Sequence, residues 1–175
     1  MTAAPDERQP ELSVVMPVYN EEGAIEGVVR SWSEEFDRLG IDYEIRIYDD
    51  GSRDGTRAIL ERLAGPVPRL VPLSHANRGH GPTILRGYTE ARGAWVFQTD
   101  SDGETGPEGF APLWAAREGY DFLLGVRRNR TSPSSRMLIT AVSRATVRLL
   151  FGRGVTDVNT PYRLMRRSCL ASLLA

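Results

Sequence analysis

Leu12-Ser13-Val14-Val15-Met16-Pro17-Val18 is a short, mostly apolar run with polar residues on both sides. Such a run is typical of a strand that is buried on both faces of a parallel sheet. Similar runs predict further strands at residues 43–48, 70–73, 95–97 and 122–126. Pro72 cannot donate a backbone hydrogen bond, so the strand at 70–73 is expected at an edge of the sheet.

Helices are predicted between these strands, because apolar residues recur there at helical spacing. They cover residues 25–39, 59–63, 82–92, 110–117 and 137–151. Asn20 is the expected cap of the first helix, Ser52 or Asp54 that of the second, and Pro82 the first residue of the third. Strands that alternate with helices form βαβ units, so we predict a Rossmann-like α/β fold with a mainly parallel sheet flanked by helices.

The 175 residues are enough for one globular domain, with 41% hydrophobic and 26% charged residues. We expect a flexible leader over residues 1–11 and a single domain over 12–175. No apolar run approaches the roughly 18 residues of a membrane-spanning helix, and the polar N-terminus does not resemble a signal peptide. Cys169 is the only cysteine, which fits a reducing, cytoplasmic compartment.

Every basic residue is an arginine, and the charges are unevenly distributed. Residues 1–126 carry 12 Arg and 22 acidic residues, whereas residues 127–167 carry ten Arg and one acid, Asp157. The Arg-rich segment is either a solvated helix face or an anion site, since the guanidinium fork matches phosphate geometry. Nucleic acid is not the expected anion, because the segment has few aromatic residues and the whole chain has a net charge of −1.

Polar segments, three of them acidic, follow four of the predicted strands, at residues 17–21, 49–52, 100–104 and 125–127. Ligands of open α/β sheets bind beyond the carboxyl ends of the strands, so we expect these segments to meet at one edge. A single acidic loop is usually a turn, but three acidic strand ends at one edge indicate a site.

Asp100-x-Asp102 is the centre of this predicted site. Two carboxylates just past a strand can both turn toward a hard cation such as Mg²⁺, which takes substrate phosphates as its remaining ligands. Such a metal would neutralise the charge that develops on a departing diphosphate. Glu104 lies close enough in the sequence to join, directly or through water.

Two other segments could bind ligands. Asp50-x-Ser52-x-Asp54-Gly55-x5-Glu61 has much of the spacing of an EF-hand calcium loop, but a strand pattern precedes it where an EF-hand needs a helix. A turn that enters a helix is therefore favoured. Asn77-Arg78-Gly79-His80-Gly81-Pro82 is a glycine-containing loop suited to a phosphate or a ribosyl group, with His80 either a pocket residue or incidental.

Taken in order, residues 13–22, 48–56, 77–81 and 100–103 resemble glycosyltransferase family 2, in particular its dolichol-phosphate mannosyltransferases and related polyprenyl-phosphate sugar transferases. The resemblance runs from about Leu12 to Arg167. It implies a GT-A fold and inverting transfer of a hexose from GDP-mannose or a UDP-sugar to a polyprenyl or dolichyl phosphate. It also implies a divalent metal, Mg²⁺ or Mn²⁺, and a peripheral position at a membrane surface.

The resemblance assigns roles to individual residues by their position. The donor-binding positions are Pro17, Tyr19, Glu21, Tyr48, Asp50, Asp100, Ser101 and Asp102. The metal positions are Asp100, Asp102 and Glu104, the acceptor-phosphate positions are Arg127, Arg136 and Thr140, and the catalytic positions are Asp100, Asp102 and Arg127. The chain departs from the family pattern at Val126, where the family has Ser, and at Pro161, where it has Gly. Relatives usually continue beyond the position of Ala175, so the chain is either a fragment or a short protein.

The acceptor distinguishes the leading function from two alternatives. A hydroxyl acceptor needs a general base, whereas a phosphate monoester is largely dianionic at neutral pH and needs only cations to hold it. After Asp121 the chain has one acid and many arginines, which favours a phosphate acceptor. The alternatives are the same donor chemistry with a saccharide hydroxyl, and a non-catalytic module that binds a nucleotide or calcium.

Overall fold

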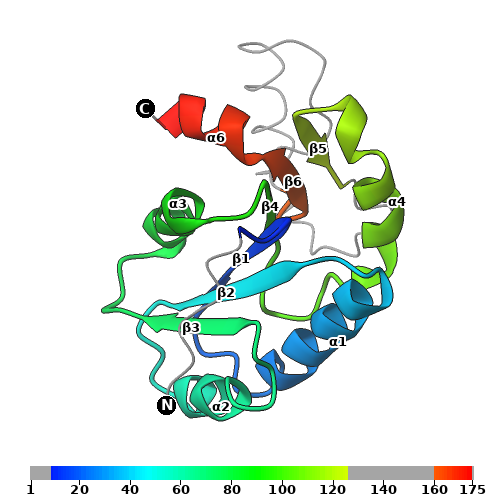
Figure 1. Cartoon of the computed structure of the whole chain (residues 1–175). Coiled ribbons are helices and arrows are strands. Elements are labelled where there is room, and N and C mark those ends of the chain that lie inside the picture. Colours follow the sequence, from blue (N-terminus) through cyan, green and yellow to red (C-terminus); the bar gives the residue numbers. More distant parts are fainter. Residues whose placement is uncertain (1–8, 126–159, 175) are drawn as a thin grey trace, which may run out of the picture.

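The computed structural model describes residues 9–125 and 160–174, which form a six-stranded mixed sheet in the order β3-β2-β1-β4-β6-β5 (Figure 1). The strands are β1 (Leu12–Val18), β2 (Tyr43–Asp49), β3 (Leu70–Ser74), β4 (Trp95–Gln98), β5 (Phe122–Leu124) and β6 (Arg163–Arg166). The predicted helix at 137–151 lies outside the described residues, as do Val126, Arg127, Arg136, Thr140, Asp157 and most of the predicted leader.

β1 is the central strand of the parallel part of the sheet. It pairs with β2 on one side and β4 on the other, so that Leu12 lies beside both Tyr43 and Trp95. All seven residues of β1 are buried, which confirms the prediction of a strand covered on both faces. β3 pairs with β2 alone and lies at the edge of the sheet, where Pro72 is tolerated, as expected.

β6 is a strand that the sequence pattern did not predict. It runs antiparallel between β4 and β5, so β5 does not pair with β4 as a simple parallel succession would require. The sheet is therefore mixed rather than wholly parallel, although β5 still points in the same direction as β4. Arg163–Arg166 has only two apolar residues between two arginines, and this pattern is too short to distinguish a strand from a loop.

Helices cover both faces of the sheet. They are α1 (Ile25–Arg38), α2 (Thr56–Leu63), α3 (His80–Glu90), α4 (Phe110–Ala115) and α6 (Arg167–Leu174), with short 3₁₀ turns at Pro107–Gly109 and Arg117–Gly119. The apolar sides of α1, α2 and α4 join one buried cluster, and α3 and α6 cover a smaller cluster on the opposite face. Figure 1 shows α3 and α6 on one side of the sheet and α1 and α4 on the other.

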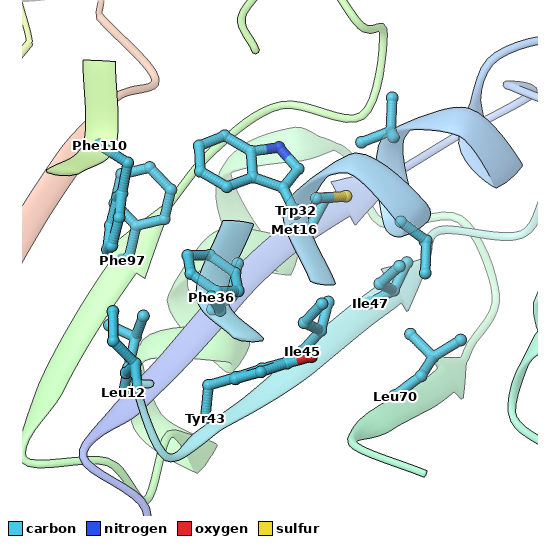
Figure 2. Packing of buried hydrophobic residues seen from close by; sticks show 14 of the residues in the cluster. Leu12, Met16, Trp32, Phe36, Tyr43, Ile45, Ile47, Leu70, Phe97 and Phe110 are labelled. Atoms are coloured by element: carbon cyan, nitrogen blue, oxygen red, sulfur yellow. The ribbon is translucent and has the colours of Figure 1, made fainter. Parts of the chain in front are cut away.

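Aromatic packing holds the larger cluster together (Figure 2). Trp32 on α1 lies 5.1 Å, centroid to centroid, from Phe97 on β4, and Phe97 lies 4.9 Å from Phe110 on α4. Each such ring pair stabilises the fold by roughly 0.5–1.5 kcal/mol beyond the contribution of the surface area that it buries. These contacts hold α1 and α4 against β4, the strand that leads into the predicted Asp100-x-Asp102 site.

The starts of two helices differ from the prediction. α1 begins after Ala24 rather than after Asn20, and the Asn20 side chain instead accepts a hydrogen bond from the Arg53 backbone N–H. α3 begins at His80, so Pro82 is its third residue. Pro82 still fits its position, because the first helical N–H groups have no partner within the helix and proline loses nothing there.

None of the helices within residues 9–125 and 160–174 combines the length and the apolar character needed to span a membrane.

Candidate functional site

A cleft of about 380 Å³ opens at the carboxyl edge of the sheet, where β1, β2 and β4 end together. Its walls come from the loops that follow these strands and from the start of α3. The lining residues are Pro17, Val18, Tyr19, Glu21, Asp50, Asn77, Gly79, His80, Thr83, Asp100, Ser101 and Asp102. The predicted convergence of the segments after these three strands is thus confirmed.

Most of the predicted donor-binding residues lie in this cleft. The structure brings together Pro17, Tyr19, Glu21, Asp50, Asp100, Ser101 and Asp102. Val18 and Thr83 also line it and were missed. The sequence pattern did not distinguish them, because it predicts Val18 as the last core residue of a strand and Thr83 as one polar residue of a helix. Only the packing of α3 against β1 shows that they face the same space.

Tyr48 is the exception, and the structure removes it from the predicted donor contacts. Its side chain is fully buried on the α3 face of the sheet, outside the cleft. The phenol lies 3.0 Å from Arg46 Nε and 3.2 Å from Glu90 Oε2. Burial raises the pKa of Tyr48, and its contact with Arg46 partly offsets that effect. Side chains alternate along a strand, so Tyr48 and Asp49 point to opposite faces of the sheet, whereas Asp50 lies just beyond the end of β2.

Asp50 lies in the cleft and also organises one of its walls. The carboxylate is almost completely buried and accepts hydrogen bonds from Arg78 N–H at 2.7 Å and Gly79 N–H at 2.9 Å. The His75 ring is 3.4 Å away. Because charge-assisted hydrogen bonds are stronger than neutral ones, Asp50 ties the end of β2 to the loop that begins α3. Gly79 has a φ of +93°, in the region that glycine adopts without strain.

The calcium-loop alternative is excluded by the same region. A strand, β2, precedes Asp50, and the oxygen atoms that would have to converge are used separately. Asp54 accepts hydrogen bonds from the backbone and hydroxyl of Thr56, whereas Glu61 pairs with Arg57. Asp54 therefore serves the start of α2 largely as predicted, although Gly55 occupies the cap position itself.

The acidic end of the cleft concentrates negative charge. Burial raises the pKa of Glu21, and the nearby charges of Asp102 and Asp54 raise it further. Four carboxylates, from Glu21, Asp50, Asp100 and Asp102, thus line one cleft, and among the described lining residues His80 is the only one whose side chain can become cationic. An anionic ligand would be repelled unless a cation accompanied it.

Asp100 and Asp102 fit a divalent cation, whereas Glu104 does not line the cleft with them. Mg²⁺ and similar hard ions bind to one or two protein carboxylates together with substrate phosphates, so two are sufficient. Glu104 is exposed and outside the cleft, and its backbone N–H donates to Asp102 Oδ1 at 2.9 Å. Among the described residues there is no cluster of three or more metal-ligating side chains, and Glu104 as a further ligand stays a prediction.

The acceptor side of the predicted site lies largely outside the described residues. The structure shows only its beginning, Gly125, whose N–H donates to the Tyr162 carbonyl at 2.8 Å. A Cβ atom at Gly125 would lie 2.9 Å from Tyr162, so glycine is needed for this close approach. Arg127, Arg136 and Thr140 follow this point and stay predictions.

Comparisons with known proteins agree with this geometry. Residues 13–174 match the family model described as Glycosyl transferase family 2. The chain is 32% identical over 167 residues to undecaprenyl-phosphate 4-deoxy-4-formamido-L-arabinose transferase of Pseudomonas fluorescens (strain Pf0-1), covering 94% of this chain and 49% of that protein. The chain spans about half the length of the curated relatives it matches.

Solved structures show the same fold. The mannosyltransferase PcManGT from Pyrobaculum calidifontis, in complex with GDP-Man and Mn²⁺, has a TM-score of 0.67 at 25% identity, over 97% of this chain and 48% of that one. Mannosyl-3-phosphoglycerate synthase from Rubrobacter xylanophilus has a TM-score of 0.69 at 18% identity, over 91% of this chain and 54% of that one. The family match covers nearly the whole chain, and the sheet and cleft are those of a GT-A fold, so the chain belongs to glycosyl transferase family 2.

Proposed function

We propose that this chain transfers a sugar from a nucleoside-diphosphate sugar to a polyprenyl phosphate, with inversion at the sugar carbon and with the help of a divalent metal. The observation that carries the proposal is the cleft itself. Asp100 and Asp102 lie at one side of it, and Asp50 with its attached loop lies in another wall. A nucleotide sugar needs both a metal site that can bind its diphosphate and groups that hold its nucleoside.

The donor is expected to bind with its nucleoside near Tyr19 and Asp50 and its diphosphate near Asp100 and Asp102. Tyr19 is 42% exposed in the cleft, so its ring is available for contact with a base. Asp100 and Asp102 would hold the Mg²⁺ or Mn²⁺, whose positive charge would stabilise the departing diphosphate. The complex of PcManGT, which has the same fold, with GDP-Man and Mn²⁺ supports a nucleotide-sugar donor and a divalent metal.

The acceptor is expected to be a phosphate rather than a hydroxyl. One acceptor phosphate oxygen would form a bond to the anomeric carbon while the bond from that carbon to the diphosphate oxygen breaks, and the nucleoside diphosphate would leave. A dianionic phosphate needs no base for this step. Arg127, Arg136 and Thr140 are the proposed phosphate contacts. The relatives named as undecaprenyl-phosphate transferases support a lipid phosphate acceptor, so we place the reaction at a membrane surface.

Calorimetry and a paired acceptor assay test the proposal. We expect UDP- or GDP-sugars to bind in the presence of Mn²⁺ and to bind much more weakly after the metal is chelated. The full-length protein should then transfer sugar to a polyprenyl phosphate and not to the matching polyprenol. Transfer to the polyprenol alone would favour the hydroxyl-acceptor alternative, and donor binding without transfer to either lipid would favour a non-catalytic module.

A further inference from the structure

Two loops that follow neighbouring strands lie against one another at the carboxyl edge of the sheet. The first loop, residues 19–22 after β1, supplies Tyr19 and Glu21 to the cleft. The second loop, residues 52–56 after β2, supplies no lining residue to the cleft, yet it is extensively bonded to the first. Its polar side chains are therefore available for a role other than direct ligand contact.

Three consecutive backbone amides of the first loop are held by side chains of the second. A short loop rarely has such a complete set of partners, because its N–H groups would otherwise bond to water. The three bonds are Asn20 N–H to Ser52 Oγ at 3.0 Å, Glu21 N–H to Thr56 Oγ1 at 2.8 Å, and Glu22 N–H to Asp54 Oδ2 at 3.2 Å.

The second loop is bonded to the first in return. Asn20 Oδ1 accepts a hydrogen bond from Arg53 N–H at 2.8 Å, and Glu22 Oε2 accepts one from Gly55 N–H at 2.6 Å. A Cβ atom at position 55 would lie 2.8 Å from that Glu22 oxygen, so a side chain there would displace the Glu22 carboxylate. The bonds run in both directions, so neither loop can move without the other. We call this pair of loops the β1–β2 clamp.

Thr56 is at the centre of the clamp. Its side chain is fully buried, and its hydroxyl both accepts from Glu21 N–H and donates to Asp54 Oδ1 at 2.6 Å. Beside it, Asn20 has a φ of +56°, a left-handed conformation that asparagine tolerates better than most residues but that the chain seldom adopts without support. The clamp supplies that support, and the bend at Asn20 lies between Tyr19 and Glu21.

We propose that the β1–β2 clamp, with Thr56 at its centre, is a positioning element that holds Tyr19 and Glu21 in their donor-binding arrangement before the donor arrives. The inference rests on the proposed function of the cleft. A loop that is already ordered loses less conformational entropy when the ligand binds, so the clamp increases donor affinity without touching the donor. Thr56 is thus a positioning residue and not a catalytic one.

The test compares Thr56→Val, which keeps the branched shape but removes the hydroxyl, with Thr56→Ser, which keeps the hydroxyl. Thr89→Val is the control, because the Thr89 hydroxyl, as far as residues 9–125 and 160–174 show, bonds to the Leu85 carbonyl of its own helix and not to the clamp. Ser52→Ala is a second variant that removes one clamp bond at an exposed position. Binding of a UDP- or GDP-sugar with Mn²⁺ is measured by calorimetry at a temperature where thermal unfolding curves show every variant to be folded.

We expect Thr56→Val to bind the donor about three- to ten-fold more weakly and Ser52→Ala about two- to five-fold more weakly, as the loss of single hydrogen bonds implies. Thr56→Ser should largely restore affinity. Hydrogen exchange should show faster exchange of the amides of residues 20–22 in Thr56→Val without donor, and renewed protection when donor is present. A merely structural threonine would shift the unfolding temperature and speed exchange of the Glu21 amide, whose acceptor is removed, but it would not weaken donor binding.

Unchanged donor affinity in both Thr56→Val and Ser52→Ala would overturn the positioning role while leaving the proposed function intact. Weakening in Thr89→Val equal to that in Thr56→Val would also overturn it, because the effect would then not be specific to the clamp. If the wild-type protein binds neither donor, the proposed function itself fails, and the clamp's role fails with it.

Discussion

Asp50→Asn is the substitution for which the structure gives the clearest magnitude. The Asp50 carboxylate uses one oxygen for Arg78 N–H and the other for Gly79 N–H. Asparagine keeps a single acceptor oxygen, so one of the two backbone N–H groups would face an amide NH₂ group instead. A hydrogen bond to a charged group contributes about 1.5–3 kcal/mol, and the site is buried, so we expect the free energy of unfolding to fall by about 2–3 kcal/mol.

For a chain of this size, that loss corresponds to a fall in Tm of roughly 4–12 °C. The variant should still fold, because domains are typically stable by about 5–15 kcal/mol. Its affinity for nucleoside diphosphates should also fall, since Asn77 and Gly79 belong to the loop that Asp50 holds and both line the cleft.

The assay is thermal and urea unfolding followed by tryptophan fluorescence, with Asp37→Asn as the matched control. Asp37 has a 64% exposed side chain and lies 3.5 Å from Arg69, and an exposed ion pair of this kind contributes about 0–1 kcal/mol. A Tm for Asp50→Asn within about 1 °C of that for Asp37→Asn would refute the view that Asp50 ties the end of β2 to the start of α3.

Three further predictions concern the metal, the acceptor and the dependence of stability on pH. Asp102→Asn should weaken the effect of Mn²⁺ on donor binding by on the order of 1 kcal/mol or more, and equal wild-type affinity with Mn²⁺ and with chelator would contradict the metal assignment. Arg136→Ala should lower kcat/KM for polyprenyl phosphate roughly ten- to a hundred-fold with donor affinity nearly unchanged, and Arg136→Lys should restore it only in part; normal transfer by Arg136→Ala would remove its acceptor role. Burial works to raise the pKa of Glu44, but hydrogen bonds from Ser13 and Arg92 outweigh it and lower that pKa. The stabilisation of the fold by the ionised Glu44 carboxylate is therefore present at neutral pH and lost as the pH falls below about 4.5. In urea titrations from pH 7 to pH 3, the free energy of unfolding of the wild type should fall more than that of Glu44→Gln.

The sequence predicted much of the site because its chemistry lies at strand ends. Asp50, Asp100 and Asp102 each follow an apolar run, and parallel strands bring such positions to one edge whatever the details of packing. Tyr48 was assigned by family resemblance alone, and Glu104 by its closeness in the sequence to Asp102 as well as by the resemblance. Neither of them lines the cleft. A side chain's direction depends on the pleat of its strand or the path of its loop, which a motif does not specify.

The β1–β2 clamp shows a second kind of contact that local sequence patterns do not predict. Ser52 and Asp54 were expected to cap a helix, and Asn20 another, because these residue types favour caps. In the structure Asn20 and Ser52 bond instead to the neighbouring loop, more than 30 residues away along the chain. Local propensity identifies residues whose side chains tend to bond to backbone groups, but it does not specify which segment supplies those backbone groups.

The sequence by itself determined the strands β1, β2 and β4, the helices between them and the acidic edge, because the hydrophobic period and the alternation of strands with helices are local properties of the chain. Only the tertiary structure decided the antiparallel insertion of β6, the burial of Tyr48 and the pairing of the loops after β1 and β2. Each of these features depends on contacts between segments that lie far apart in the sequence. Such contacts form because buried backbone groups need partners and side chains need surfaces to pack against, and a local pattern does not specify which segment supplies them.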